Sequence, residues 1–139
     1  MPVHLIKMAV GVSDFAELRR LQKQRRKERG RYCFFTRNMP RRLEEVLDGG
    51  SIYWVIKGHV QARQLLRRFT PVVGDDGERY CTVEYDKELV PVLWQPRRPF
   101  QGWRYLEPKD APPDRPAYAA EDDNLPPAMA QELRALGLL

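Results

Sequence analysis

Basic and aromatic side chains alternate in the stretch RRPFQGWRY, which spans residues 97–105. Aromatic rings stack on unpaired bases, a contact worth ~1–3 kcal/mol per base, and guanidinium groups bind phosphates. The stretch therefore predicts a surface for single-stranded nucleic acid, formed by Arg97, Arg98, Phe100, Trp103, Arg104 and Tyr105. A structural alternative fits the spacing equally well. Large rings are mostly buried, so they would anchor the segment while the arginines surround it.

A second set of cations lies between residues 19 and 31, a window with eight basic side chains and one acidic side chain, Glu28. The window belongs to a predicted helix over residues 14–29, with Ser13 as the candidate N-cap and Gly30 as the terminating residue. At about 100° per residue, one side of this helix is suited to packing on a sheet. That side has Phe15, Leu18 and Leu21, with Gln22 and Arg25 beside them.

Five cations gather on the opposite side of the predicted helix: Arg19, Arg20, Lys23, Arg26 and Lys27. Solvent-facing helices ordinarily mix both signs of charge, whereas this face has one sign. Clustered Lys and Arg side chains gain affinity for nucleic acid by releasing counterions from phosphates. We therefore interpret the face as a phosphate-contacting surface. A solvated helix surface without a ligand is the alternative.

The stretch LDGGSIYWVIKGHVQARQ, residues 47–64, joins a turn to a polar exit through a run of large apolar side chains. The backbone amides of residues 48–51 could cradle a phosphate, or the residues end a helix and begin a strand. Apolar side chains occupy both alternating faces of residues 51–57, which is typical of a central strand covered on both sides. If the strand continues, His59, Gln61 and Arg63 lie on one side of it. They would then read base edges or line a ligand pocket; the alternative is that they keep an edge strand soluble.

Further segments complete a mixture of strands and helices. The pattern of apolar residues and turn formers predicts strands over residues 3–11, 31–38 and 89–94, and a short helix over residues 40–50. Pro91 places the last of these strands at a sheet edge, because proline has no N–H to donate to a neighbouring strand.

Residues 60–73 are compatible with either type of element. Ala62, Leu65, Leu66 and Phe69 have helical spacing, but the sequence GDDG at residues 74–77 indicates the loop of a hairpin. We favour a strand over residues 60–73, with a local break at Pro71.

Charge and proline divide the chain of 139 residues. Residues 1–106 have 21 basic and 12 acidic side chains, whereas residues 107–139 have 3 and 7. A hydrophobic content of 42% and a charged content of 31% are those of a globular domain rather than a disordered or membrane protein. We predict one domain over residues 1–106, a proline-rich acidic extended segment over 107–126 and an amphipathic helix over 127–139. The last two parts are candidates for contact with a partner protein.

Signatures of nucleophilic catalysis and of zinc binding are weak. Cys33 and Cys81 are not in CxxC spacing, so we expect two reduced thiols in or near the core. A nucleophile paired with a base is conceivable as Cys33 with His59 or as Cys81 with His4, but no local sequence supports either pair.

The carboxylates of Glu84 and Asp86 alternate to one face of a predicted strand and could bind a metal or transfer protons, but such pairs are usually solvated. We assign no catalytic residue, no metal site and no cofactor, and we favour a protein that is not an enzyme. The N-terminal residues lack a basic region followed by a long apolar stretch, so we expect no signal peptide, no membrane association and a cytoplasmic location.

The stretches LDGGSIYWVIKGHVQARQ and RRPFQGWRYL, residues 47–64 and 97–106, resemble a bacterial family catalogued as a domain of unknown function. The resemblance covers most of residues 1–115. It implies a small cytoplasmic protein, and it brings no activity and no catalytic residues.

A second resemblance concerns the fold. The order of strand, exit with Gly58, Val60 and Arg63, long hairpin and closing aromatic strand is similar to the PUA and ASCH-like small β-barrels. This similarity implies binding of RNA or modified bases, although fold does not establish function. The basic helix at residues 14–29 departs from a minimal barrel.

Together these patterns predict an α+β protein with a small curved or barrel-like mixed sheet, flanked by helices. The predicted function is non-catalytic binding of RNA or another polyanion by the basic helix face, the arginine–aromatic stretch and a pocket lined by His59 and Arg63. A protein–protein adaptor is the alternative function, and an enzyme acting on a nucleotide or nucleic acid is a third.

Overall fold

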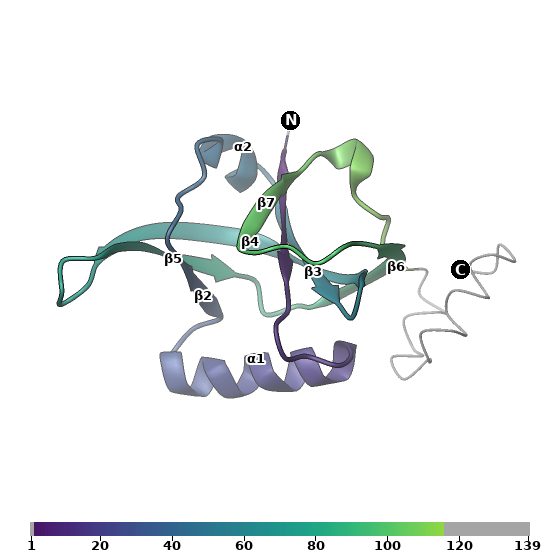
Figure 1. Cartoon of the computed structure of the whole chain (residues 1–139), viewed down its shortest axis with the longest axis horizontal. Helices are drawn as coiled ribbons and strands as arrows, with labels where there is room; N and C mark the ends of the chain where they lie inside the picture. The colour runs from purple at the N-terminus through teal and green to yellow at the C-terminus, as the bar shows by residue number, and fades with distance from the viewer. Residues whose placement is uncertain (1, 116–139) are drawn as a thin grey trace, which may run out of the picture.

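Seven strands, two α-helices and one 3₁₀ helix follow one another in residues 2–115, the part of the chain that the computed structural model describes (Figure 1). In chain order they are β1 (His4–Met8), α1 (Phe15–Arg29), β2 (Cys33–Thr36), α2 (Leu43–Leu47), β3 (Ser51–Ile56), β4 (His59–Val73), β5 (Arg79–Tyr85), β6 (Val90–Pro96), β7 (Trp103–Leu106) and η1 (Pro108–Asp110). The predicted α+β class is confirmed.

The strands form one mixed sheet in the order β2-β5-β4-β3-β1-β7, with β6 paired to β4 beside this path. β1 runs parallel to β3, and the other pairs are antiparallel. The end strands of this order, β2 and β7, have no pairing with each other, so the sheet is open rather than a closed barrel. β6 has β4 as its strand neighbour and one isolated bridge on residue 92, in agreement with an edge position for Pro91.

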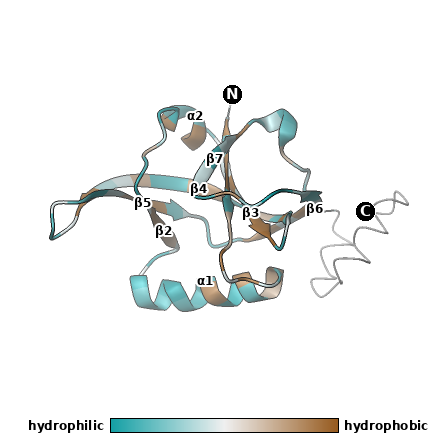
Figure 2. Ribbon diagram, viewed as in Figure 1, coloured by the Kyte–Doolittle hydropathy of each residue, from teal (hydrophilic) through white to brown (hydrophobic). Residues whose placement is uncertain are grey.

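β3 is the central strand that the sequence predicted, and all six of its residues are buried. Ile52, Trp54 and Ile56 belong to one hydrophobic cluster, whereas Tyr53 and Val55 belong to a second. The two clusters form the core on the two faces of the sheet, because alternate residues of a strand point to opposite faces. Hydrophobic colouring follows β3 in Figure 2, whereas most of α1 is hydrophilic.

β4 resolves the ambiguity of residues 60–73 in favour of a strand of 15 residues. It pairs with β3 and β6 in its first half and with β5 in its second half, where it forms the long hairpin of Figure 1. The predicted break at Pro71 is wrong, because Pro71 pairs with Cys81 in continuous register. The irregularity lies instead between Leu66 and Arg68. Within the described strands, β4 has only β5 beside it at Pro71, and a strand with one open edge accommodates a residue without an N–H.

α1 begins one residue later than predicted, since its N-cap is Asp14 and not Ser13. The Asp14 carboxylate accepts a hydrogen bond from the Glu17 amide at 2.8 Å, and the Glu17 carboxylate accepts one from the Ser13 amide at 3.0 Å. This reciprocal arrangement satisfies amides that a helix start leaves unpaired. Gly30 ends the helix in the left-handed conformation, as expected from its position.

The second helix is shorter than the sequence suggested. α2 contains five residues of the predicted 40–50 segment and lies opposite α1 in Figure 1. After β7, residues 107–115 return to β6, where the Leu93 amide donates to the Pro113 carbonyl and Val92 bridges Asp114. The remainder of the predicted proline-rich segment and the predicted helix over 127–139 lie outside the described residues. No helix of the described part is both long and apolar enough to cross a membrane.

Candidate nucleic-acid interface

The outward face of α1 is the cationic surface that the sequence predicted. All five of its predicted cations are exposed: Arg19, Arg20, Lys23, Arg26 and Lys27. Arg20 lies 3.8 Å from Glu17, which is a loose, exposed ion pair. The helix presents this face because Phe15, Leu18 and Gln22 are buried on the other side.

A buried amide pair fixes α1 on the sheet. Gln22 and Gln64 exchange two hydrogen bonds, with N–O distances of 2.8 and 2.7 Å. The Gln64 amide also donates to the Asp86 carbonyl at 3.0 Å, and its oxygen accepts from the Trp54 indole at 2.8 Å. These hydrogen bonds satisfy the buried polar atoms of both side chains. Because the bonds join α1 to β3 and β4, they fix the position of the helix relative to these strands.

The arginine–aromatic stretch does not form one continuous surface, because consecutive residues of β7 point to opposite faces. Trp103 and Tyr105 pack against the cluster that also contains α1 residues, and Trp103 is the cross-strand neighbour of Lys7. Arg104 points to the other face, where its guanidinium lies 4.9 Å from the centre of the Phe100 ring.

Phe100 is flanked by two cations, since Arg97 also lies 5.8 Å from its ring centre. Arg98 is exposed. Arg97, Arg104 and Phe100 therefore form a small group of their own near the start of β7, separate from the rings of Trp103 and Tyr105.

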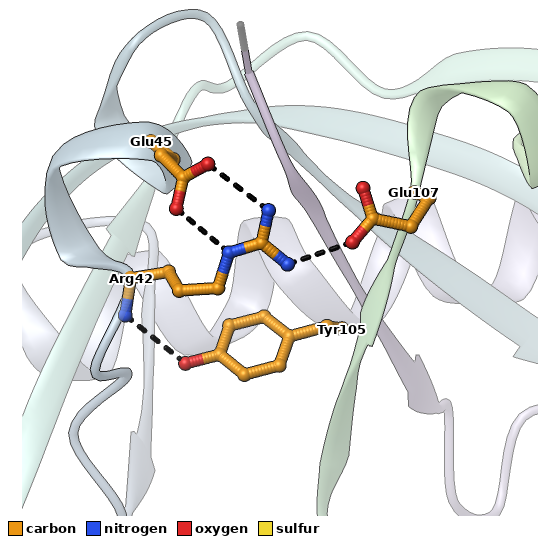
Figure 3. A network of polar contacts seen from close by, with 4 residues as sticks. All are labelled: Arg42, Glu45, Tyr105 and Glu107. Carbon is orange, nitrogen blue, oxygen red and sulfur yellow. Dashed lines mark hydrogen bonds and ion pairs between the residues drawn. The ribbon is translucent and has the colours of Figure 1, made fainter.

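The rings of Trp103 and Tyr105 also serve as anchors, in line with the structural alternative. Tyr105 accepts a hydrogen bond from the Arg42 amide at 3.1 Å (Figure 3). The Arg42 guanidinium in turn donates to Glu45 at 2.7 and 3.0 Å and to Glu107 at 2.7 Å, linking α2 to the end of β7. The Trp103 indole donates to the Asn38 carbonyl at 3.1 Å. Both rings keep part of their surface exposed.

The predicted row of His59, Gln61 and Arg63 is not formed. A register shift against β3 and β6 near Gln61 reverses the alternation, so Gln61 is buried and donates to the Ile56 carbonyl at 2.8 Å. Arg63 binds Asp114 through two hydrogen bonds of 2.6 and 2.7 Å. The His59 ring lies 5.4 Å from the Trp94 ring. The structure therefore places His59 and Arg63 in separate environments rather than in one pocket.

Residues 48–51 form the helix stop and strand entry, and not a phosphate cradle. The amides of Asp48 and Gly50 donate to the carbonyls of Glu45 and Val46, and the Ser51 amide donates to the His4 ring at 3.0 Å. Amides that are already bonded cannot also bind a phosphate.

A cavity that the sequence did not indicate lies between α1 and the sheet. It has a volume of about 170 Å³, and its walls include the rings of Phe34, Trp54 and Tyr85 together with Lys7 and Arg25. The signals that could have suggested it are two cations in apolar surroundings. Arg25 was expected on the packing side of the helix, and Lys7 interrupts an apolar strand.

The cavity is electrostatically unusual, because two cations, Lys7 and Arg25, line it together and repel each other. Burial and the neighbouring Arg25 guanidinium both lower the pKa of Lys7. The Lys7 ammonium lies 5.7 Å from the centre of the Phe34 ring, but within the described residues neither Lys7 nor Arg25 has an ion pair with a carboxylate. Burial raises the pKa of Tyr85 to about 12, so its hydroxyl stays protonated at neutral pH.

The remaining candidates for chemistry, Glu84 and Asp86, both lie beside arginines. Glu84 lies 3.7 Å from both Arg31 and Arg68, and Asp86 lies 3.0 Å from Arg67. Each of the two carboxylates therefore has an arginine partner.

Cys33 and Cys81 are both buried free thiols, as expected. The Cys81 sulfur lies 3.8 Å from the Met39 sulfur, while the His4 ring is bonded to the Ser51 amide. In residues 2–115, no three His, Cys, Asp or Glu side chains are grouped as metal ligands.

The fold and the basic helix define a small α+β protein with an open mixed sheet, and comparison with known proteins assigns its family. The chain belongs to the family described as protein of unknown function, DUF1489, which it matches over residues 5–139. The predicted membership of a domain-of-unknown-function family is thereby confirmed. No curated protein and no solved structure matches the chain.

Proposed function

We propose that the protein is a non-catalytic module that binds RNA or another single-stranded nucleic acid through the outward face of α1. The observation that supports this function best is the exposure of five cations on one side of a single helix. A surface with charge of one sign attracts ligands of the opposite charge and raises their local concentration. Phosphates are the partner that such a surface fits, because neutralising them releases counterions.

The fixed position of α1 favours the proposal. The Gln22–Gln64 pair and the buried side chains Phe15 and Leu18 hold the helix against the sheet, so its cations are presented on a rigid support. Binding then requires no ordering of the helix, and less conformational entropy is lost.

A route for the strand leads from α1 toward β7. Arg25 and Lys7 are neighbours, and Lys7 is opposite Trp103, whose ring is partly exposed. Trp103 would supply a stacking surface beside the cations. The group of Arg97, Phe100 and Arg104 on the other face, together with the exposed Arg98, would make separate contacts with phosphates.

The relation to PUA and ASCH-like domains is part of the same proposal. Its support is the order of elements: the turn at Gly58 between β3 and β4, the long β4–β5 hairpin and the final aromatic strand β7.

The salt dependence of RNA binding tests the function. Fluorescence anisotropy with a labelled single-stranded RNA is expected to show affinity that falls steeply with salt, with a slope of about −0.7 per phosphate contact. The triple variant K23Q/R26Q/K27Q removes three exposed charges from α1 and should make the slope shallower by about 2. The variant R41Q/R79Q/K109Q, which removes three exposed charges elsewhere, is the matched control.

The outcome that contradicts the function is equal binding by the two triple variants, or affinity that does not respond to salt. A partner whose affinity does not change with salt concentration would instead favour the adaptor function, in which apolar contacts dominate. The segment predicted for that role lies mostly outside the described residues, and no contact of the described part favours it.

A further inference from the structure

The cavity between α1 and the sheet has walls suited to a planar ring. The ring centres of Phe34 and Trp54 are 5.7 Å apart and those of Trp54 and Tyr85 are 6.1 Å apart, both in edge-to-face geometry. The volume of about 170 Å³ is close to the roughly 150 Å³ of an engineered apolar cavity that binds benzene. Because the three rings are in direct contact with one another, a single six-membered ring fits in the cavity beside them and not between them.

Two cations and the hydroxyl group of Tyr85 are the polar groups of the cavity that have no hydrogen-bond partner among the described residues. The Lys7 ammonium and the Arg25 guanidinium have no carboxylate partner within the described residues. The Tyr85 hydroxyl makes no hydrogen bond to another described residue, although Tyr85 is only 6% exposed. The nearby Gln22 oxygen is already bonded to Gln64. Two cations and a hydroxyl group that can donate, none of them bonded to an acceptor among the described residues, are complementary to an anion.

Two like charges close together beside apolar rings oppose folding. Each cation has lost part of its hydration, and no acidic side chain in residues 2–115 forms an ion pair that would compensate their mutual repulsion. A fold retains such a costly arrangement where a ligand repays it, as active and binding sites commonly do. An anion at this position would offset the repulsion directly.

We propose that this cavity binds a nucleotide, with a pyrimidine-sized ring packed against the rings of Phe34, Trp54 and Tyr85 and the phosphate between Lys7 and Arg25. The sugar would lie at the mouth of the cavity, since its volume accommodates the ring alone. Free mononucleotides and an unpaired nucleotide of a bound strand share this chemistry. The site lies on the inward side of α1, so it is distinct from the outward cations. It depends on the proposed function only in the case in which the bound nucleotide belongs to a nucleic-acid strand.

Calorimetric titration of the full chain with uridine monophosphate tests the site directly. We expect saturable binding, and binding at least tenfold weaker for uridine and for inorganic phosphate, which each lack one half of the ligand. The variant K7Q/R25Q should lose at least tenfold in affinity. The control R79Q/K109Q, with the same change in net charge on exposed positions, should bind as the unmodified protein does.

A variant that retains both cations provides a second test. Ala9 lines the cavity, and Ala9→Phe should obstruct it, so ligand binding is lost while thermal unfolding of the unliganded variant shows that it remains folded. A short single-stranded RNA distinguishes the two sources. The natural ligand is a nucleotide within a strand if the RNA binds at least tenfold more tightly than the free mononucleotide and if K7Q/R25Q weakens the binding of the RNA.

Specific results would overturn the site. These are no saturable binding of either the mononucleotide or the RNA, equal affinity in K7Q/R25Q and its control, or phosphate bound as tightly as the nucleotide. The test is separate from that of the proposed function. The variant K23Q/R26Q/K27Q should retain mononucleotide binding even where its salt-dependent RNA binding is reduced, so either proposal can fail alone.

Discussion

The side-chain amides of Gln22 and Gln64, 42 residues apart in the chain, form a closed pair of hydrogen bonds between α1 and β4. Gln64 is completely buried and Gln22 is 3% exposed. Because the same Gln64 amide also bonds the Trp54 indole and the Asp86 carbonyl, it joins α1, β3, β4 and the end of β5 in one network.

Gln64→Leu should therefore destabilise the protein strongly. The change leaves Gln22, Trp54 and the Asp86 carbonyl without partners, and each unsatisfied buried group costs ~1–3 kcal/mol. We expect the free energy of unfolding in urea to fall by about 2–5 kcal/mol, while the exposed Gln24→Leu has little effect. The double variant Q22L/Q64L should be more stable than Q64L. If Q22L/Q64L is no more stable than Q64L, the hydrogen bonds between Gln22 and Gln64 do not couple the two side chains energetically.

Gly50→Ala tests the junction between α2 and β3. A Cβ at Gly50 would collide with the backbone carbonyl oxygens of Val46 and Val3, which cannot move independently of α2 and β1. Overpacking of this kind costs about 1–3 kcal/mol, and chemical denaturation should reveal a loss of that size. Gly49→Asn is the comparison, because its site is open and its φ of 87° is one that Asn tolerates. Equal stability of the two variants would contradict this account.

The Arg42 network should make stability depend on acid pH. Hydrogen bonds from Arg42 lower the pKa of Glu45 from its ordinary value of 4.5. The carboxylate therefore contributes stability above pH 4.5, and this contribution is lost as the pH falls through the lower, folded-state pKa. Arg42→Gln should lower the urea midpoint modestly at neutral pH, since the groups are solvent-screened, and the difference should shrink in acid. Arg41→Gln should show no such pH dependence; a constant difference for Arg42→Gln would argue against the linkage.

Lys7 has the opposite relation to stability. Its pKa is lowered by burial and by Arg25, so the folded state disfavours the charged ammonium. The folded protein releases the Lys7 proton at lower pH than the unfolded chain does. The free energy of unfolding therefore rises with pH until the pH reaches the ordinary lysine pKa of 10.5. Lys7→Met should therefore raise the urea midpoint at neutral pH, with an advantage that fades toward pH 10.5. Lys109→Met, at an exposed position, is the control. Destabilisation by Lys7→Met at neutral pH would show that the contact with Phe34 dominates.

The helical spacing within residues 60–73 has a structural explanation that local periodicity did not provide. Ala62, Leu66 and Phe69 belong to one core cluster although they lie in a strand. The interval from Ala62 to Leu66 is even, as a strand requires, but the register shift between Leu66 and Arg68 adds one residue before Phe69. A β-bulge thus produces a spacing of four and three residues that imitates a helix. Only the pairing with β5 distinguishes the two.

The sequence alone determined the elements whose signals lie within a few neighbouring residues. The helix over residues 14–29 with its two faces, the doubly buried strand β3, and the turn at residues 74–77 all follow from local periodicity and from turn-forming residues. Charge clustering likewise indicated which side of α1 would face solvent, because a single helix fixes the relative direction of its own side chains.

The tertiary structure decided which distant residues meet. Arg63 was expected in a pocket with His59, but pairing with β6 and the return of the chain bring Asp114 to it from 51 positions away. Lys7, Arg25 and Tyr85 come from β1, α1 and β5, and no local pattern links them. The physical reason is that periodicity records the environment of each residue along one element, whereas a cavity depends on strand order, register shifts and helix docking across the whole sheet.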